Sequence, residues 1–398
     1  MKHLARFCRL IAGLVFICSG FLKLLSPVGT SLIIKEYLTA FHLGFMAPAA
    51  MVLGIALASL EFLTGVALLL RLRFAHAAWI ALVLISAFTP LTLYLAVFNP
   101  IADCGCFGEA IHLTNWQTFF KNLILLPCTI IMFIGRHKVA EGERPVAEWI
   151  FVCLFALLAA AVLLQTFLWA PLAEFTAYKV GSEIKSAPVQ SVAEQYETEF
   201  RYEKDGDVQT FTLDNLPDST WTFVEAITTL KGEDADAADS DFLIEADGVD
   251  ISAELLGQRK LLLMSIYHPD KFMQRHSLDE VYRIKKKADK QGLSFALASS
   301  GILEGMPDEI PVNRADVKLL MTLNRSNGGV TLLDEGVVIR KWPYVRAASE
   351  SVNFCGDQDP ELTLLMTVNR QRMSLGIVLV AFILLCLAKF RVFYKKKE

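Results

Sequence analysis

Charged residues are scarce in this chain of 398 residues. They make up 20% of it, whereas apolar types make up 54%, and the mean hydropathy is +0.43. This composition excludes a disordered protein and is too apolar for an ordinary soluble one. The net charge is −4 and no basic tract is present, which argues against nucleic acid as a partner. Eight cysteines are too few for a small domain held together by disulfides. The composition therefore indicates a membrane protein.

Two further absences concern processing and cofactors. The first apolar run continues past Gly20 without a small-x-small cleavage site, so we expect a retained helix and not a cleaved signal peptide. No haem or flavin motif is present, and the sequence alone leaves the cofactor unknown.

The charge that is present is unevenly distributed. Residues 172–372 contain 34 acidic and 22 basic residues, a net charge of −12. The remaining residues contain 8 acidic and 16 basic residues, a net charge of +8. This pattern indicates a membrane bundle that carries one large water-facing domain.

Six apolar stretches are long enough to cross a hydrocarbon core of about 30 Å. They are residues 5–25, 47–70, 74–98, 118–135, 149–170 and 374–393. If six spans alternate, the lysine and arginine clusters that flank them all fall on one side, which the positive-inside rule makes the cytoplasmic side. We therefore expect cytoplasmic termini, and we expect the loop 99–117 and the domain 172–372 to be extracytoplasmic.

Two ionisable side chains lie within these predicted spans. Glu61 is in the middle of the second span, where a charge costs at least about 2.5 kcal/mol, so it should face inward and be paired or protonated. Lys23, toward the outer end of the first span, is the candidate partner, because the helical rise brings the two residues to depths that a lysine stem can bridge. Alternatively, Lys23 extends to the interface and Glu61 is a protonated packing residue.

The loop between the third and fourth spans contains the run Cys104-Gly-Cys106-Phe-Gly108. The glycines permit tight turns that bring the two cysteines to disulfide distance. A disulfide closed across one residue is strained and suited to exchange, which makes Cys104 and Cys106 candidate catalytic residues. A fixed disulfide, free thiols or half of a metal site remain open, although two thiolates alone rarely bind zinc.

Two neighbours bear on this cysteine pair. Cys355 is the one cysteine of the outer domain and lies close in sequence to the sixth span, so it is the candidate redox partner. The adjacent acids Asp103 and Glu109 would disfavour a thiolate, because a cation and not an anion lowers the pKa of a thiol.

The first two spans and the cysteine run share features with known membrane proteins. Residues 13–23, which contain Ser19, Gly20 and Lys23, and residues 61–70, which begin with Glu61, resemble the DoxX-type four-helix membrane family. The run 104–108 is similar to the related MauE-like branch. The resemblance covers about residues 1–137 and implies a small bundle of the bacterial inner membrane. MauE proteins are associated with disulfide formation during methylamine dehydrogenase maturation, and some DoxX proteins with quinone chemistry. The resemblance therefore implies thiol redox chemistry, with quinone as a candidate cofactor; nothing in the sequence points to methylamine itself.

The outer domain has the predicted order strand, helix, strand, helix, hairpin. These elements are residues 260–267, 270–290, 293–298, 313–324 and 329–342, preceded by hairpins with Asp-Gly turns within 197–213 and 241–252. The segment 241–342 resembles TlpA-like proteins of the thioredoxin fold. It lacks their redox cysteines, because His268-Pro-Asp-Lys271 follows the first buried strand and Gly328-Gly329 replaces the expected proline. We interpret it as a degenerate module for docking or for shielding the membrane site, with His268 as a cap or a lone acid–base group.

The predicted fold is an α-helical membrane bundle, with a four-helix DoxX-like core plus two further spans, and an extracytoplasmic α/β thioredoxin-like domain. The predicted parts are 1–137 (four-helix domain), 138–171 (loop and fifth span), 172–240 (hairpin and acidic linker), 241–372 (thioredoxin-like domain) and 373–398 (sixth span and tail). The acidic segment 232–250 lacks the ligand spacing of a calcium loop, which favours a solvated face or linker.

Two functions of different classes are compatible with these observations. In the first, Cys104 and Cys106 exchange with an extracytoplasmic client or with Cys355, and electrons pass to a quinone near Glu61. In the second, the chain is a non-enzymatic scaffold or assembly factor, and the outer domain binds a partner. A transporter has less support, because the chain lacks internal repeats and broken helices. Whether the chain is an enzyme stays open, and the mutual position of the three cysteines would distinguish the first two functions.

Overall fold

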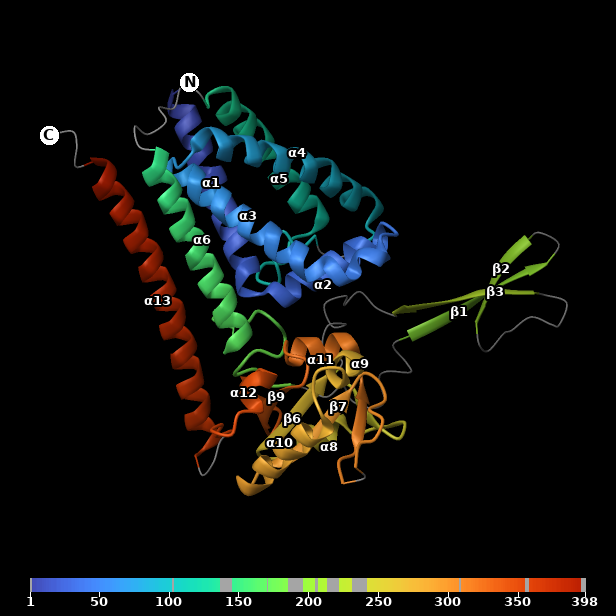
Figure 1. Ribbon diagram of the computed structural model, residues 1–398. Helices are drawn as coiled ribbons and strands as arrows, with labels where there is room; N and C mark the ends of the chain where they lie inside the picture. The colour runs from blue at the N-terminus through green and yellow to red at the C-terminus, as the bar shows by residue number, and fades with distance from the viewer. Residues whose placement is uncertain are drawn as a thin grey trace.

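The computed structural model describes most of the chain. The described residues are 2–101, 104–136, 145–169, 171–184, 196–204, 207–212, 222–230, 242–307, 309–354 and 358–394. They form a bundle of long helices and an α/β domain at one end of it (Figure 1). The start of α1 and the end of α13 both lie at the opposite end of the bundle.

Six helices in the described part of the chain are long and apolar enough to cross a membrane. They are α1 (Lys2–Leu25), α3 (Ala50–Leu70) with the preceding 3₁₀ helix η1 (Gly44–Ala49), α4 (Phe74–Phe98), α5 (Asn115–Ile134), α6 (Pro145–Leu168) and α13 (Pro360–Tyr394). Each overlaps one of the apolar stretches predicted from the sequence. From these helices we conclude that the chain is an integral membrane protein.

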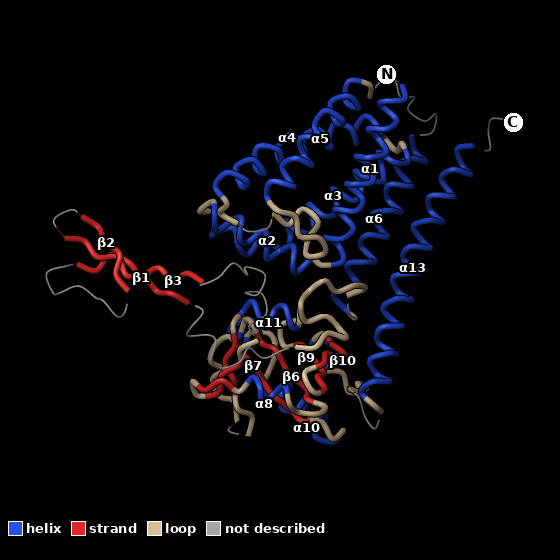
Figure 2. The backbone as a smooth tube through the Cα atoms, turned by 180° about the vertical axis from the view of Figure 1, so that it is seen from behind, coloured by secondary structure: helices blue, strands red, loops and turns tan. Residues whose placement is uncertain are grey.

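Helix α2 (Pro27–Ala40) was not predicted and lies in the connection between the first two spans. Its 14 residues are too few to cross a membrane, which needs about 20. Pro27 suits the first turn of a helix, because a proline there loses no helical hydrogen bond. In both ribbon and tube views α2 lies at the end of the bundle nearest the α/β domain (Figures 1 and 2).

Helices α1 and α3 pack closely because glycines remove side chains from their interface. A Cβ atom at Gly20 would lie 2.7 Å from the backbone oxygen of Ala58. A Cβ atom at Gly65 would lie 2.5 Å from the backbone nitrogen of Ile17. Small residues allow this kind of backbone approach between membrane helices.

The α/β domain contains a seven-stranded mixed sheet. Its order is β10-β9-β6-β7-β8-β4-β5, in which β6 pairs parallel with β7 and antiparallel with β9. The strands are β4 (Ile244–Ala246), β5 (Val249–Asp250), β6 (Leu261–Ile266), β7 (Ser294–Ser299), β8 (Val312–Ala315), β9 (Gly329–Asp334) and β10 (Val337–Trp342). The central strand β6 is buried along its whole length, because helices cover both faces of the sheet.

The helices of this domain are α8 (Ser252–Leu256), α9 (Pro269–Met273), α10 (Leu278–Lys290), α11 (Val317–Leu323) and α12 (Tyr344–Ala347). Two predictions made from the sequence were wrong here. The helix predicted at 270–290 is two helices, α9 and α10. The helix predicted at 313–324 begins only at α11, because Asp316 caps it by accepting the Lys318 amide at 2.7 Å, and the residues before it form the edge strand β8.

A second, three-stranded antiparallel sheet has the order β2-β1-β3. Its strands are β1 (Tyr196–Lys204), β2 (Asp207–Thr212) and β3 (Thr222–Leu230), and β1 and β2 form the predicted first hairpin. The second predicted hairpin is β4–β5, where Asp247 and Gly248 both have positive φ. The part of the acidic segment from 232 to 241 lies outside the described residues.

Candidate functional site

The loop between α4 and α5 folds back against the helices that flank it. Asn99 ends α4 with a left-handed conformation, and the Asn115 side chain donates to its Oδ1 at 2.8 Å. Gly105 and Gly108 have φ values of +63° and +64°, and the Gly108 amide closes a turn onto the Gly105 carbonyl. Such φ values favour glycine, because a side chain would be strained there. The two glycines thus give the cysteine run its tight shape.

The turn places both cysteines against the bundle. Cys104 is buried, and its Sγ lies 3.0 Å from the Thr118 Oγ1 of α5. The Tyr37 hydroxyl of α2 donates to the Cys104 carbonyl at 2.9 Å. Cys106 is half-buried, and its backbone amide donates to the Cys104 sulfur at 3.4 Å. In this structure both residues are free thiols.

The structure brings Lys23 and Glu61 together next to this turn. The Lys23 Nζ atom lies 2.7 Å and 2.9 Å from the two carboxylate oxygens of Glu61, and both residues are buried. The Ser19 hydroxyl lies 2.8 Å from Glu61 and 2.6 Å from the carbonyl oxygen of Cys106. Ser19 therefore links the buried ion pair of α1 and α3 to the cysteine turn.

The environment shifts the pKa values of the two thiols in opposite directions. The pKa of Cys106 is lowered to about 6, first by a hydrogen bond with the Cys104 side chain and then by the positive charges of Lys121 and Lys23. These effects outweigh burial and the charge of Glu61, which raise it. The pKa of Cys104 is raised by the same hydrogen bond and by burial. At neutral pH the arrangement favours one thiolate, on Cys106, beside one thiol.

A cavity of about 340 Å³ adjoins the pair. Its polar lining includes Ser19, Lys23, Glu61, Cys104, Cys106 and Lys121. The rest is mostly apolar and comes largely from α2 and α4. The lining residues Ile34, Phe41 and Phe88 are only partly buried or exposed, so the cavity lies close to the outer surface of the bundle. An apolar pocket with a few converging polar groups is the usual form of a small-molecule site.

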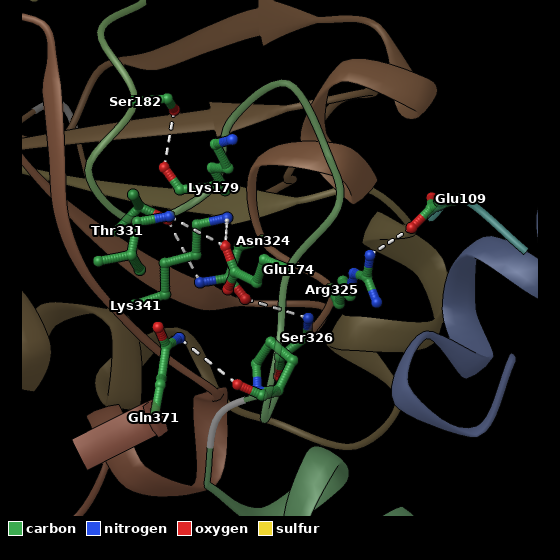
Figure 3. Close-up of polar contacts among 12 residues, drawn as sticks. Glu109, Glu174, Lys179, Ser182, Asn324, Arg325, Ser326, Thr331, Lys341 and Gln371 are labelled. Carbon is green, nitrogen blue, oxygen red and sulfur yellow. Dashed lines mark hydrogen bonds and ion pairs between the residues drawn. The ribbon is translucent and has the colours of Figure 1, made fainter. Parts of the chain in front are cut away.

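The α/β domain contacts the same loop (Figure 3). Arg325, between α11 and β9, forms an ion pair with Glu109, and the two side chains point toward each other. Glu109 also accepts a hydrogen bond from the Ser26 hydroxyl at 2.6 Å, and Gly29 leaves the space that its carboxylate occupies. The carboxylate predicted to disfavour a thiolate is thus engaged by a cation from the other domain.

Two loops of the α/β domain lie near the bundle: one follows β6, and the other joins α11 to β9. Asn327 joins these two loops, because its Oδ1 accepts the Tyr267 and His268 amides at 2.9 Å and 3.1 Å. Lys271 lies near enough to Lys35 of α2 for its charge to lower the pKa of Lys35, after the larger effect of burial. His268 is the residue that precedes α9, but its side chain makes no capping hydrogen bond there.

Two residues considered in the sequence analysis lie outside the described residues. Cys355 and Asp103 lie outside them, so the distance from Cys355 to the cysteine pair is not part of this structure. Within the described ranges, no group of three or more His, Cys, Asp or Glu residues could hold a metal ion.

Sequence reasoning missed several residues of this site. They are Tyr37, Thr118, Lys121 and Arg325, whereas Ser19 was noted only as part of the DoxX resemblance. A signal for Lys121 was available, because it is a charged residue in the fourth apolar stretch, and such residues usually mark functional sites.

Comparison with known proteins supports part of the resemblance. Residues 1–135 match the family described as Methylamine utilisation protein MauE, which is about a third of the chain and ends with α5. Residues 196–233, which contain the three-stranded sheet, match a family described as a domain of unknown function (DUF8463). No curated protein and no solved structure matches the chain. The resemblance to MauE is confirmed for the membrane domain, whereas the DoxX and TlpA-like resemblances stay predictions.

Proposed function

We propose that the chain is a membrane thiol oxidoreductase in which Cys104 and Cys106 alternate between a disulfide and two thiols. One observation carries this proposal: Cys106, whose pKa is lowered to about 6, lines a cavity together with Lys23, Glu61 and Lys121. A merely structural cysteine pair needs neither a stabilised thiolate nor an adjoining cavity. The positive-inside charge pattern favours the extracytoplasmic side of a bacterial inner membrane for this loop.

The reaction has two balanced halves. In the first, an extracytoplasmic client dithiol reduces the Cys104–Cys106 disulfide through a mixed disulfide, so that the client gains a disulfide and the pair gains two electrons and two protons. In the second, the two thiols re-form their disulfide and release two electrons and two protons. A quinone, when bound, would accept the two electrons and the two protons.

The residues of the cavity fit such a lipid-soluble acceptor. Apolar side chains such as Ile33 and Leu91 provide surfaces for a flat ring, and Lys23 and Lys121 provide cationic donors beside the Cys106 sulfur. The same two lysines stabilise the Cys106 thiolate. Ser19 lies between Glu61 and the Cys106 carbonyl, and its one hydroxyl proton can be donated to either, so it connects the ion pair to the turn.

We assign a shielding role to the α/β domain. It has no cysteine in the described residues, and its contact with the loop is an ion pair between Arg325 and Glu109. A domain that covers the loop limits which thiols reach Cys106, so it would select among clients without taking part in exchange.

Purified full-length protein in detergent tests the proposal. The reduced protein is mixed with a short-chain ubiquinone analogue, and quinol absorbance and free thiols are followed together. We expect one quinone reduced for each pair oxidised, no reaction in Cys106→Ser, and normal reaction in the matched control Cys153→Ser, which alters an exposed cysteine of α6. If wild-type protein keeps both thiols while every tested quinone stays oxidised, the oxidoreductase proposal fails and the scaffold function is favoured.

A further inference from the structure

A second and larger cavity lies between the α/β domain and the helices α6 and α13. Its volume is about 430 Å³. Its titratable lining residues are Glu174, Arg340, Lys341, Arg346 and Arg370. It shares no lining residue with the cysteine cavity, so a ligand bound there is independent of the proposed redox chemistry.

Only one of the cations in this cavity has a carboxylate partner within the described part of the chain. Lys341 lies 3.0 Å from Glu174, and both side chains are buried (Figure 3). Arg340 and Arg346 instead contact aromatic faces, with guanidinium carbons 4.8 Å from the Trp342 ring and 3.6 Å from the Trp169 ring. The cavity therefore keeps a net charge of about +3 after Glu174 and Lys341 offset each other.

Arg340 and Arg370 lie close enough to repel each other. The pKa of Arg340 is lowered by burial and further by the positive charge of Arg370. Repulsion of this kind is relieved by a bound anion, and the planar guanidinium matches the oxygens of a phosphate. Serine and asparagine side chains in the same lining can donate further hydrogen bonds.

The cavity lies at the level of the membrane interface, which favours a lipid as the anion that it binds. Trp169 directly follows the apolar helix α6, and tryptophan is enriched at membrane interfaces. The Gln371 amide donates to the Pro171 carbonyl at 3.4 Å and ties α13 to the segment after α6 at this level. The two helices lie side by side at the edge of the bundle in both views (Figures 1 and 2).

A separate apolar cleft of about 90 Å³ lies farther along the same two helices, where they face α1 and α3. Its lining includes Ala159 and Val162 of α6 and Val378 and Phe382 of α13, about one to two turns below the charged cavity. A charged cavity at the interface above an apolar cleft between helices matches the two parts of a phospholipid.

We propose that this cavity binds the phosphate group of an anionic phospholipid, with an acyl chain in the cleft between α6 and α13. The shared chemistry is a phosphate held by Arg340, Arg346 and Arg370. A free phosphate offers the same oxygens but has nothing to place in the cleft.

Native mass spectrometry of the full-length protein in detergent tests this proposal. The probes are phosphatidylglycerol, phosphatidylcholine and inorganic phosphate. We expect tighter binding of phosphatidylglycerol than of either other probe. Arg340→Gln and Arg370→Gln should each weaken it about fivefold or more, since each cation near an anionic lipid contributes about that factor. Arg340→Lys, which keeps the charge, should retain part of the binding.

Arg372→Gln is the matched control, because Arg372 lies on α13 two residues from Arg370 and does not line the cavity. It should bind phosphatidylglycerol like wild type, and size-exclusion profiles should show that every variant is folded. Equal binding of both lipids, or unchanged binding in folded Arg340→Gln and Arg370→Gln, would overturn the proposal. Binding of inorganic phosphate as tight as that of phosphatidylglycerol would overturn the assignment to a lipid.

Discussion

Cys106 is the residue on which the chemistry depends. A thiol reacts as its thiolate, and an ordinary cysteine with a pKa near 8.5 is mostly protonated at neutral pH. Here a hydrogen bond from Cys104 and two lysines lower that pKa to about 6. A substitution of Lys121 tests this explanation more cleanly than one of Lys23, because Lys23 also has a structural role in its ion pair with Glu61.

The first prediction concerns the pH dependence of Cys106. Thiolate is present above the pKa, so the alkylation rate should fall as pH falls through about 6. Lys121→Gln should move this midpoint upward, because one of the stabilising charges is lost. Lys35→Gln on α2 is the control and should leave it unchanged. Mass spectrometry of the alkylated peptide gives the rates; a wild-type midpoint above 8 would refute the electrostatic explanation.

The buried ion pair supports a second prediction at this scale. Removing one partner leaves an unpaired charge, so Lys23→Met or Glu61→Gln alone should each cost about 3 kcal/mol of stability. The double variant should cost less than the sum, since neither charge then remains alone. Thermal unfolding in detergent measures all three; additive losses would show that the pair does not act as a unit.

At the residue scale, the sequence predicted the cysteine pair and a partner for Glu61, but not the thiolate. The reasoning used the sequence neighbours Asp103 and Glu109, and these are acids. In the folded chain Glu109 faces Arg325, whereas Lys121, 15 positions beyond Cys106, provides the cation. Such neighbours depend on how α5 packs, which a local sequence pattern does not contain.

At the scale of elements, the contact between α1 and α3 positions the site. Glycines at this contact let the two backbones approach, and Lys23 lies one turn beyond Gly20. The approach brings the lysine to Glu61, and through Ser19 it also positions the cysteine turn.

The third prediction tests this packing. Gly20→Leu should abolish or strongly destabilise the folded bundle, because its side chain would overlap the backbone at Ala58 and Phe62. The matched control is Gly376→Leu on α13, where a Cβ atom meets nothing within 4 Å. Yield of monodisperse protein and thermal unfolding are the measurements. A Gly20→Leu protein as stable as Gly376→Leu would contradict the packing described for α1 and α3.

The six membrane helices were predictable because a long apolar run is a local signal. Helix α2 was not, since its 14 residues include Lys35 and Glu36 and are too short for a span. In the α/β domain the buried strand β6 and the hairpin β9–β10 were predicted from their apolar pattern. The strand β8 was not, because four residues before a cap carry too little pattern to separate strand from helix.

At the scale of the whole molecule, an ion pair between Arg325 and Glu109 joins the α/β domain to the cysteine loop. Arg325 and Glu109 are 216 positions apart, so no sequence pattern predicted their contact. The α/β domain lies at the end of the bundle opposite to the start of α1 and the end of α13 (Figure 1). This contact is the structural basis for the shielding role that we propose.

The fourth prediction is that weakening this contact exposes Cys106. Arg325→Gln and Glu109→Gln should each raise its labelling rate by a large impermeant reagent about fivefold, as expected for the loss of about 1 kcal/mol. The double variant should resemble the single ones, because both remove the same interaction. Labelling at pH 8 keeps Cys106 as thiolate throughout.

The control for this experiment is Arg259→Gln, which removes an exposed ion pair elsewhere in the α/β domain and should not alter labelling. Unchanged labelling in Arg325→Gln and in Glu109→Gln would mean that the α/β domain does not shield the loop.

The most direct test of the proposed function is the redox state of the pair in cells. Intact cells are treated with a membrane-impermeant alkylating reagent, with and without prior reduction, and mass analysis locates the labels on Cys104 and Cys106. The proposed function predicts that the pair shifts between disulfide and thiols as respiration is blocked and restored. A pair that stays bonded, or stays free, under every condition would contradict it.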